Sequence, residues 1–136
     1  MIAKVKDDKA GKVVLLSHSV PEHKNYPLRF KITTISVGSI VMIGLCNKAH
    51  LTQKTFKFDS KTFFNSENNA NHGLYVAASN GFVYSSGDSQ INGTKNHLSF
   101  KTGDELGLEV DAKESRLVVK KKSDSKSVEI SLKHIQ

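Results

Sequence analysis

Several residue types are scarce in this sequence. It contains no tryptophan, one cysteine and two prolines among 136 residues, and Arg29 and Arg116 are its only arginines. It has no apolar run near the ~20 residues that a membrane-spanning helix requires. Its first residues, MIAKVKDDKAGK, are too polar for the hydrophobic segment of a secretory signal. We therefore expect an intracellular protein, in the cytoplasm or the nucleus, that makes no contact with membranes.

The basic charge is carried almost entirely by lysine. The formal net charge is +7. Sequence-specific recognition of nucleic acids favours the planar guanidinium of arginine, so this composition argues against it. For the densest cluster, Lys120, Lys121 and Lys122, we expect a solvated strand end or edge guard rather than a phosphate site. A lysine-rich polyanion or nucleic-acid binder stays open as an alternative function.

The hydrophobic pattern predicts one all-β domain that spans residues 1–136, with residues 1–10 disordered. Hydrophobic residues make up 38% and charged residues 24% of the chain, enough to build a core. Period-2 alternation between turn signals is typical of a sandwich or barrel. The expected strands are residues 13–17, 28–35, 40–46, 55–58, 74–78, 82–85, 106–110, 116–120 and 128–132. The nearly uniform apolar run 40–46 predicts a central strand buried on both faces.

Two Asn-Gly pairs mark turns in the middle of the chain. Asn80-Gly81 predicts a two-residue hairpin loop, which would place Ala77 opposite Tyr84 and Ala78 opposite Val83. The sequon Asn92-Gly93-Thr94 is interpreted as a second turn. Residues 65–72, NSENNANH, have little to bury and predict an exposed loop.

The sequence offers no constellation of catalytic or metal-binding residues. It lacks a G-x-S-x-G elbow and phosphate-binding glycine motifs, and its six histidines are scattered without metal-ligand spacing. Cys46 lies in the apolar run IVMIGLC, where a free thiol packs as a small hydrophobe. Adjacent carboxylates on the strand 104–111 would face opposite ways. We expect a protein that is not an enzyme and has no catalytic residues, cofactor or metal.

Three segments resemble the SPRY domain family. They are LRFKITTISVGSIVMIGLCNK, HGLYVAASNGFVYSSGDS and FKTGDELGLEVDAKESRLVVKK, which follow one another in the family's order over residues 26–121. The resemblance implies a bent sandwich of two antiparallel sheets. It also implies that loops at one edge bind other proteins or short peptides, as in ubiquitin-ligase adaptors and large assemblies.

The chain departs from the SPRY pattern in three places. The family's tryptophans are absent, and Lys120-Lys121-Lys122 stands where the family usually has an Asn-Gly turn. The family's closing strand should follow Leu132. We therefore expect a sandwich that lacks its last strand, either because the chain is a fragment or because a partner completes the sheet by β-augmentation.

The predicted function is a non-enzymatic protein–protein interaction module that binds a peptide segment or partner subunit through edge loops. Its partner is expected within a large complex or a ubiquitin-ligase assembly. The loops are residues 18–26, 47–54, 65–72 and 86–96. The predicted contact residues are Tyr26, Asn47, Lys48, Asn71, His72, Tyr84 and Asp88. For Tyr84, packing across the strands is an equally good interpretation. A lectin-like carbohydrate-binding sandwich is the other alternative.

Overall fold

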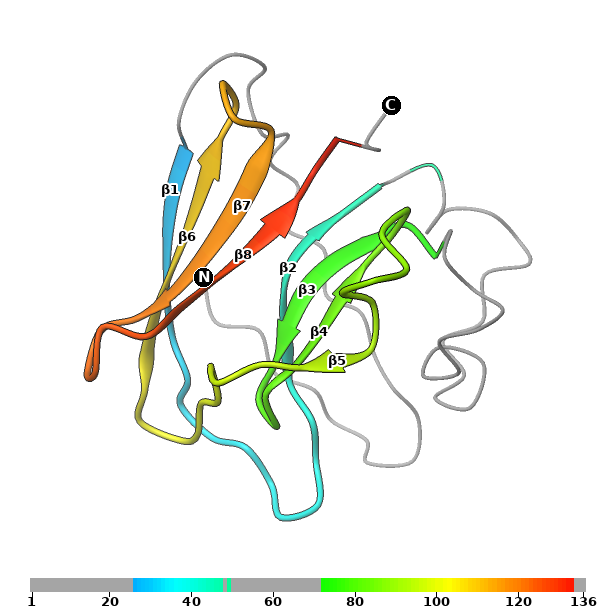
Figure 1. The fold of residues 1–136 in the computed structure, drawn as a ribbon. Helices are drawn as coiled ribbons and strands as arrows, with labels where there is room; N and C mark the ends of the chain where they lie inside the picture. The colour runs from blue at the N-terminus through cyan, green and yellow to red at the C-terminus, as the bar shows by residue number, and fades with distance from the viewer. Residues whose placement is uncertain (1–25, 48, 50–71, 134–136) are drawn as a thin grey trace.

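The computed structural model describes residues 26–47, 49 and 72–133. In this part of the chain eight strands form two antiparallel four-stranded sheets that face each other as two layers (Figure 1). The expectation of an all-β sandwich of two antiparallel sheets is therefore confirmed. The strands expected at residues 13–17 and 55–58, and the expected disorder of residues 1–10, lie outside the described residues.

Sheet A contains the first strand and the last three. Its order is β1 (Tyr26–Lys31), β6 (Glu105–Asp111), β7 (Arg116–Lys121) and β8 (Ser127–Ser131). Alternation sets the two faces of β6, where Leu106, Leu108 and Val110 are buried. The expected hairpin of residues 106–110 and 116–120, and the expected strand at 128–132, agree with β6, β7 and β8 to within one or two residues.

Sheet B contains the four strands between them in the chain. Its order is β2 (Met42–Cys46), β3 (Leu74–Ala78), β4 (Phe82–Ser85) and β5 (Thr94–Lys95). The expected strands at 74–78 and 82–85 have the observed bounds, and the two-residue β5 was not predicted. β3 is buried at all five positions.

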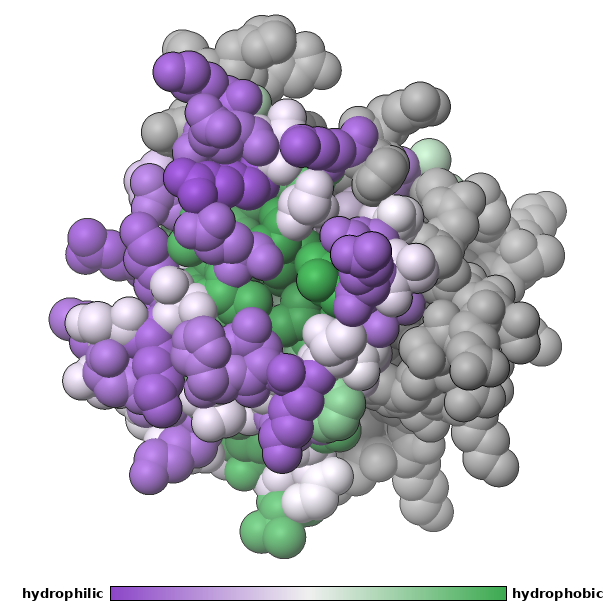
Figure 2. Space-filling model, viewed as in Figure 1, coloured by the Kyte–Doolittle hydropathy of each residue, from purple (hydrophilic) through white to green (hydrophobic). Residues whose placement is uncertain are grey.

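The core lies between the two sheets, where β7 and β8 face β2, β3 and β4. In Figure 2 apolar atoms occupy the centre of the view, between the sheets, with hydrophilic side chains around them. Each fully buried leucine, isoleucine or valine contributes about 1.5–3 kcal/mol relative to an exposed one. The cluster consists of Tyr75, Ala77, Val83, Leu98, Leu108, Val110, Leu117, Val119, Val128, Ile130 and Leu132.

The register of the β3–β4 hairpin differs by one residue from the prediction. Ala77 lies opposite Val83, whereas the sequence predicted Tyr84 there. The loop holds three residues, because Gly81 N donates to Ala78 O at 2.9 Å and Gly81 itself has φ +90°. A turn followed by a left-handed glycine is the usual three-residue hairpin loop. The predicted two-residue loop was therefore wrong, and Val83 and Tyr84 exchange faces relative to it.

The prediction of a central strand at residues 40–46 was also wrong for the described part of the chain. Among the described strands, β2 ends its sheet and pairs with β3 alone. At Gly44, within this apolar run, β2 lies so close to β3 that a Cβ would overlap the carbonyl oxygen of Tyr75. The glycine in this segment is therefore required by the close approach of β2 to β3. In the described sheet, the segment is not a central strand buried on both faces. The strand expected at 28–35 ends at Lys31.

Candidate functional site

Three segments meet at one end of sheet B: the residues just after β2, just before β3 and just after β4. Asn47 N donates to Gly73 O at 2.7 Å, and Ser86 N donates to Leu74 O at 2.8 Å. These bonds continue the antiparallel ladders beyond the strand ends. The pairing of β2, β3 and β4 therefore carries Asn47, His72 and the β4–β5 loop (residues 86–93) to the same end of the sandwich (Figure 1).

His72 is the centre of a buried polar network at this end. Its Nδ1 accepts a hydrogen bond from Leu74 N at 3.1 Å, and its Nε2 lies 2.9 Å from Asn92 Oδ1. Since an amide oxygen only accepts, Nε2 carries the hydrogen and the ring is the neutral Nε2–H tautomer. His72 is 4% exposed and Asn92 3%. The network thus joins the start of β3 to the far end of the β4–β5 loop.

Asn92 and the two serines tie the loop to both neighbouring strands. Asn92 Oδ1 also accepts from Ser85 N at 3.2 Å, and Ser86 Oγ accepts from Gly73 N at 3.0 Å. Burial raises the pKa of Tyr75, and its side-chain hydrogen bond with Ser86 partly offsets that rise. The Ser85 hydroxyl is fully buried and has no hydrogen-bond partner within the described residues. Apart from this hydroxyl, the buried polar side chains of the network have partners, and such a network fixes one loop conformation.

The β4–β5 loop is also bonded within itself. Asp88 Oδ1 accepts from Gln90 N at 3.0 Å and from Ile91 N at 3.4 Å, and Asn92 N donates to Asp88 O at 3.0 Å. This is the local turn that an aspartate side chain favours. Ile91 packs against the core cluster, whereas Ser89 and Gln90 are exposed. The loop is therefore held at its base and along its length, and it presents Ser89 and Gln90 to solvent.

The predicted contact residues that the structure describes lie in different parts of the molecule. Asn47, His72 and Asp88 lie at this end of sheet B, but His72 is buried and Asn47 and Asp88 are half-buried. Tyr84 is 3% exposed in β4, where it packs with Leu74, Val76 and Ala78.

Tyr26 begins β1 in sheet A, and its side chain is not described. Lys48 and Asn71 lie outside the described residues.

Burial raises the pKa of Tyr84 to about 12, so its hydroxyl is neutral at physiological pH.

Sequence reasoning missed the side chains of Asn92 and Ser86, which hold the loop. Residues 92–94 were interpreted as a turn, and Gly93 does have a left-handed φ of +72°. What the pattern did not show is that the Asn92 side chain points into the protein. An asparagine before a turn glycine is common in exposed loops as well. The spacing of Asn92 from His72 carries no periodic signal that would have revealed the contact.

This end of sheet B holds two side chains of reactive types, His72 and Cys46. Both nitrogens of His72 are engaged, so proton transfer by the ring would break the network. Burial raises the pKa of the Cys46 thiol, which disfavours the reactive thiolate. In the described ranges no group of three His, Cys, Asp or Glu side chains could hold a metal ion. That part of the chain also contains no helix with the length and apolar character needed to cross a membrane.

The lysine cluster lies at the end of β7, as the sequence predicted for a strand end. Lys120 Nζ is 3.1 Å from Glu109, Lys121 Nζ 2.8 Å from Asp124, and Lys122 Nζ 2.8 Å from Glu105. Because β7 lies between β6 and β8, these lysines do not guard a sheet edge. Each of the three is paired with a carboxylate.

Comparison with known proteins gives no match: no family model, no curated protein and no solved structure matches this chain. The resemblance to SPRY domains therefore stays a prediction.

Proposed function

We propose that this protein is a non-enzymatic protein–protein interaction module that binds a peptide segment or partner subunit through the β4–β5 loop end of sheet B. The observation that supports this proposal is the preorganised loop. It is anchored by Asn92 and Ser86 and bonded internally through Asp88. A loop that is already ordered loses little conformational entropy when a partner binds, so more of the contact energy becomes affinity.

The residues at this end have different roles in the proposal. Ser89 and Gln90 make contact with the partner, because they are exposed at the loop tip. Half-buried Asn47 borders the same surface. His72 and Tyr84 are buried and support the loop end from below. Contact through Tyr26, Lys48 and Asn71 remains a prediction from the sequence.

The setting of the interaction follows from the SPRY resemblance and is part of the proposal. Such domains recognise partners in ubiquitin-ligase adaptors and large assemblies. We propose an intracellular partner protein of this kind.

Affinity capture from the native cell, followed by quantitative mass spectrometry, tests the proposal. The double variant S89R/Q90R places two bulky cations on the loop tip without touching the buried network. We expect it to lose the partner that the unaltered protein captures, and to weaken binding of the purified partner by about tenfold or more. K113A in the β6–β7 turn, also exposed, is the matched control.

A third variant separates contact from support. H72A leaves Ser89 and Gln90 in place and loosens the loop, so we expect weaker binding with a faster dissociation rate. If S89R/Q90R and H72A both bind the purified partner as tightly as K113A does, the loop end is not the binding surface.

A further inference from the structure

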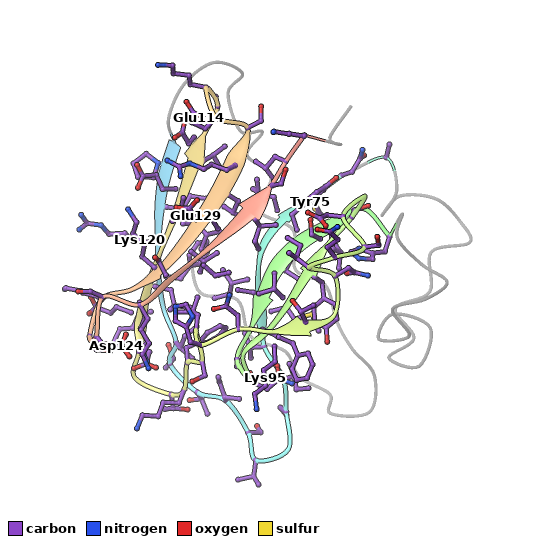
Figure 3. All side chains as sticks on the ribbon, viewed as in Figure 1. Tyr75, Lys95, Glu114, Lys120, Asp124 and Glu129 are labelled. Carbon is purple, nitrogen blue, oxygen red and sulfur yellow. The ribbon has the colours of Figure 1, made fainter. Side chains whose placement is uncertain are left out.

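The outer face of sheet A carries a local excess of positive charge on three neighbouring strands. Arg29 in β1 lies opposite Gly107 in β6, which lies opposite Lys120 in β7. In the adjacent row, Lys31 lies opposite Glu105, whose carbonyl accepts from Lys122 N. In Figure 3 Lys120 points away from the sandwich on this side of sheet A. Cations from β1 and β7 thus flank a glycine in β6.

Gly107 leaves a hollow between these cations. A Cβ at this position would meet only Leu28 O, at 4.0 Å, so the space above the glycine is open. The hollow measures about 440 Å³, and its charged lining consists of Arg29, Lys31, Lys120, Lys122 and Glu105. It is large enough for a phosphate group with part of the molecule that carries it.

The cations that line the hollow outnumber its carboxylates. Glu105 pairs with Lys122 at 2.8 Å and Glu109 with Lys120 at 3.1 Å. Arg29 and Lys31 have no ion pair or side-chain hydrogen bond within the described part of the chain. Lys122 lowers the pKa of Glu105 most, and Lys31 and Arg29 lower it further. The positive charges of all three residues therefore act on the same carboxylate.

The other charged side chains of this face, Arg116, Asp111 and Glu129, form one network. Arg116 binds both Asp111, at 3.2 Å, and Glu129, at 2.8 Å. The excess of positive charge is therefore confined to the rows that flank Gly107. A uniformly solvated lysine face would spread it more evenly.

We propose that the hollow above Gly107 binds a phosphate group, either that of a phosphate monoester or free phosphate, held by Arg29, Lys31 and Lys120. The guanidinium of Arg29 offers two parallel N–H donors to phosphate oxygens. A phosphate monoester brings close to two negative charges and three acceptor oxygens, which suits several cations at once. Lys120 can turn from the exposed Glu109 to this ligand at little cost. This site lies on sheet A and is independent of the loop surface proposed above.

NMR titration of the full chain, labelled with ¹⁵N, tests the site with two probes, inorganic phosphate and O-phosphoserine. We expect saturable shifts concentrated at Gly107, Arg29 and Lys120 with either probe. R29Q should weaken binding by about tenfold, because it removes the unpaired guanidinium. K113Q, an exposed lysine outside the hollow, should leave it unchanged. Tighter binding of O-phosphoserine assigns the site to a phosphorylated residue, and equal binding assigns it to free phosphate.

Filling the hollow provides a second test that does not depend on removing a cation. G107E places a carboxylate opposite Arg29 and Lys120, and G107Q is its uncharged counterpart. We expect both to abolish phosphate binding, and G107E alone to raise Tm. Unchanged phosphate affinity in G107E or R29Q overturns the proposal. So do shifts that never saturate, shifts spread over all lysines, or tighter binding of a single-stranded oligonucleotide than of O-phosphoserine.

Discussion

The β6–β7 hairpin and the β3–β4 hairpin share antiparallel pairing but differ in what covers their faces. In β6 the apolar side chains alternate with Glu105, Gly107 and Glu109, so one face is wet. In β3 all five residues are buried. A slip by one residue would turn the apolar set of β6 to solvent, whereas it would leave β3 with apolar residues on both faces. Alternation therefore specifies register in the first hairpin and leaves it to the turn in the second.

The largest expected effect is in the core of the better specified hairpin. Leu117 in β7 is fully buried. L117A should lower the free energy of unfolding by about 2–5 kcal/mol, because it removes buried methyl groups and leaves a cavity. Urea denaturation measures this change. K113A, in the turn of the same hairpin, should change the free energy of unfolding little, and a loss below ~1 kcal/mol in L117A would mean that the site collapses freely.

The next largest effect is expected at the buried polar network around His72, at the end of sheet B. H72A removes the acceptor of Leu74 N and the donor to Asn92. Leaving such buried groups without partners should cost about 1–3 kcal/mol of unfolding free energy. NMR relaxation should show faster motion of the Asp88 and Gln90 amides. H97A, at an exposed histidine, is the control. Equal stability and equal loop motion in the two variants would contradict the support role of His72.

The turn glycines should differ by the space around them. Gly81 and Gly103 have similar φ angles, +90° and +92°. G81A and G103A should each lose about 1–2 kcal/mol from the left-handed backbone. A Cβ at Gly81 would also lie 2.9 Å from Asn96 O, whereas a Cβ at Gly103 would meet nothing within 4 Å. Thermal unfolding should therefore give a lower Tm for G81A than for G103A. A lower Tm for G103A would contradict the inference that the three-residue loop at Gly81 sets the register of the β3–β4 hairpin.

The two hairpins should also respond to opposite ends of the pH scale. In β4, burial raises the pKa of Tyr84 from 10.0 to about 12. The unfolded chain loses this proton at lower pH than the folded one, so the contribution is complete below pH 10 and declines as pH rises to about 12. The urea midpoint of Y84F should fall less steeply over this range. An identical alkaline slope in both proteins would show that Tyr84 is more solvated than its burial indicates.

The smallest effect is expected at the turn of the β6–β7 hairpin. The hydrogen bond from Glu114 N, with help from Arg116, holds the pKa of Asp111 below its ordinary value. A lowered pKa contributes stability above the ordinary value, near 3.9, and that contribution is lost as pH falls through the folded value. D111N should flatten the acid limb of the stability curve slightly, since water still reaches both side chains of the partly buried pair. Circular dichroism at graded pH checks this, with K113Q as control.

The strands β6, β7 and β8 of sheet A could be predicted from the sequence because charged and apolar residues alternate there, whereas the pairing of β1 with β6 was not predicted. Glu105, Glu109 and Glu129 mark the outer face, and each has a cation beside it. Sheet B was harder to predict. Phe82, Val83 and Tyr84 are apolar in succession, so the sequence does not show which of them face the core. At the loop end, the sequence predicted His72 and Asp88 as contacts but not their bonds to Asn92 and Gln90. Such bonds depend on backbone positions that a one-dimensional pattern does not contain.

The order of strands in sheet A has a consequence for how the chain is made. β1 pairs with β6, and all four strands of sheet B lie between them in the sequence. A chain leaves the ribosome from its N-terminus at about 5–20 residues per second, so β3 and β4 can pair while β6 is still unmade. For several seconds β1 lacks β6, which is its pairing partner among the described strands. This strand is where a ribosome-associated chaperone would be of most use.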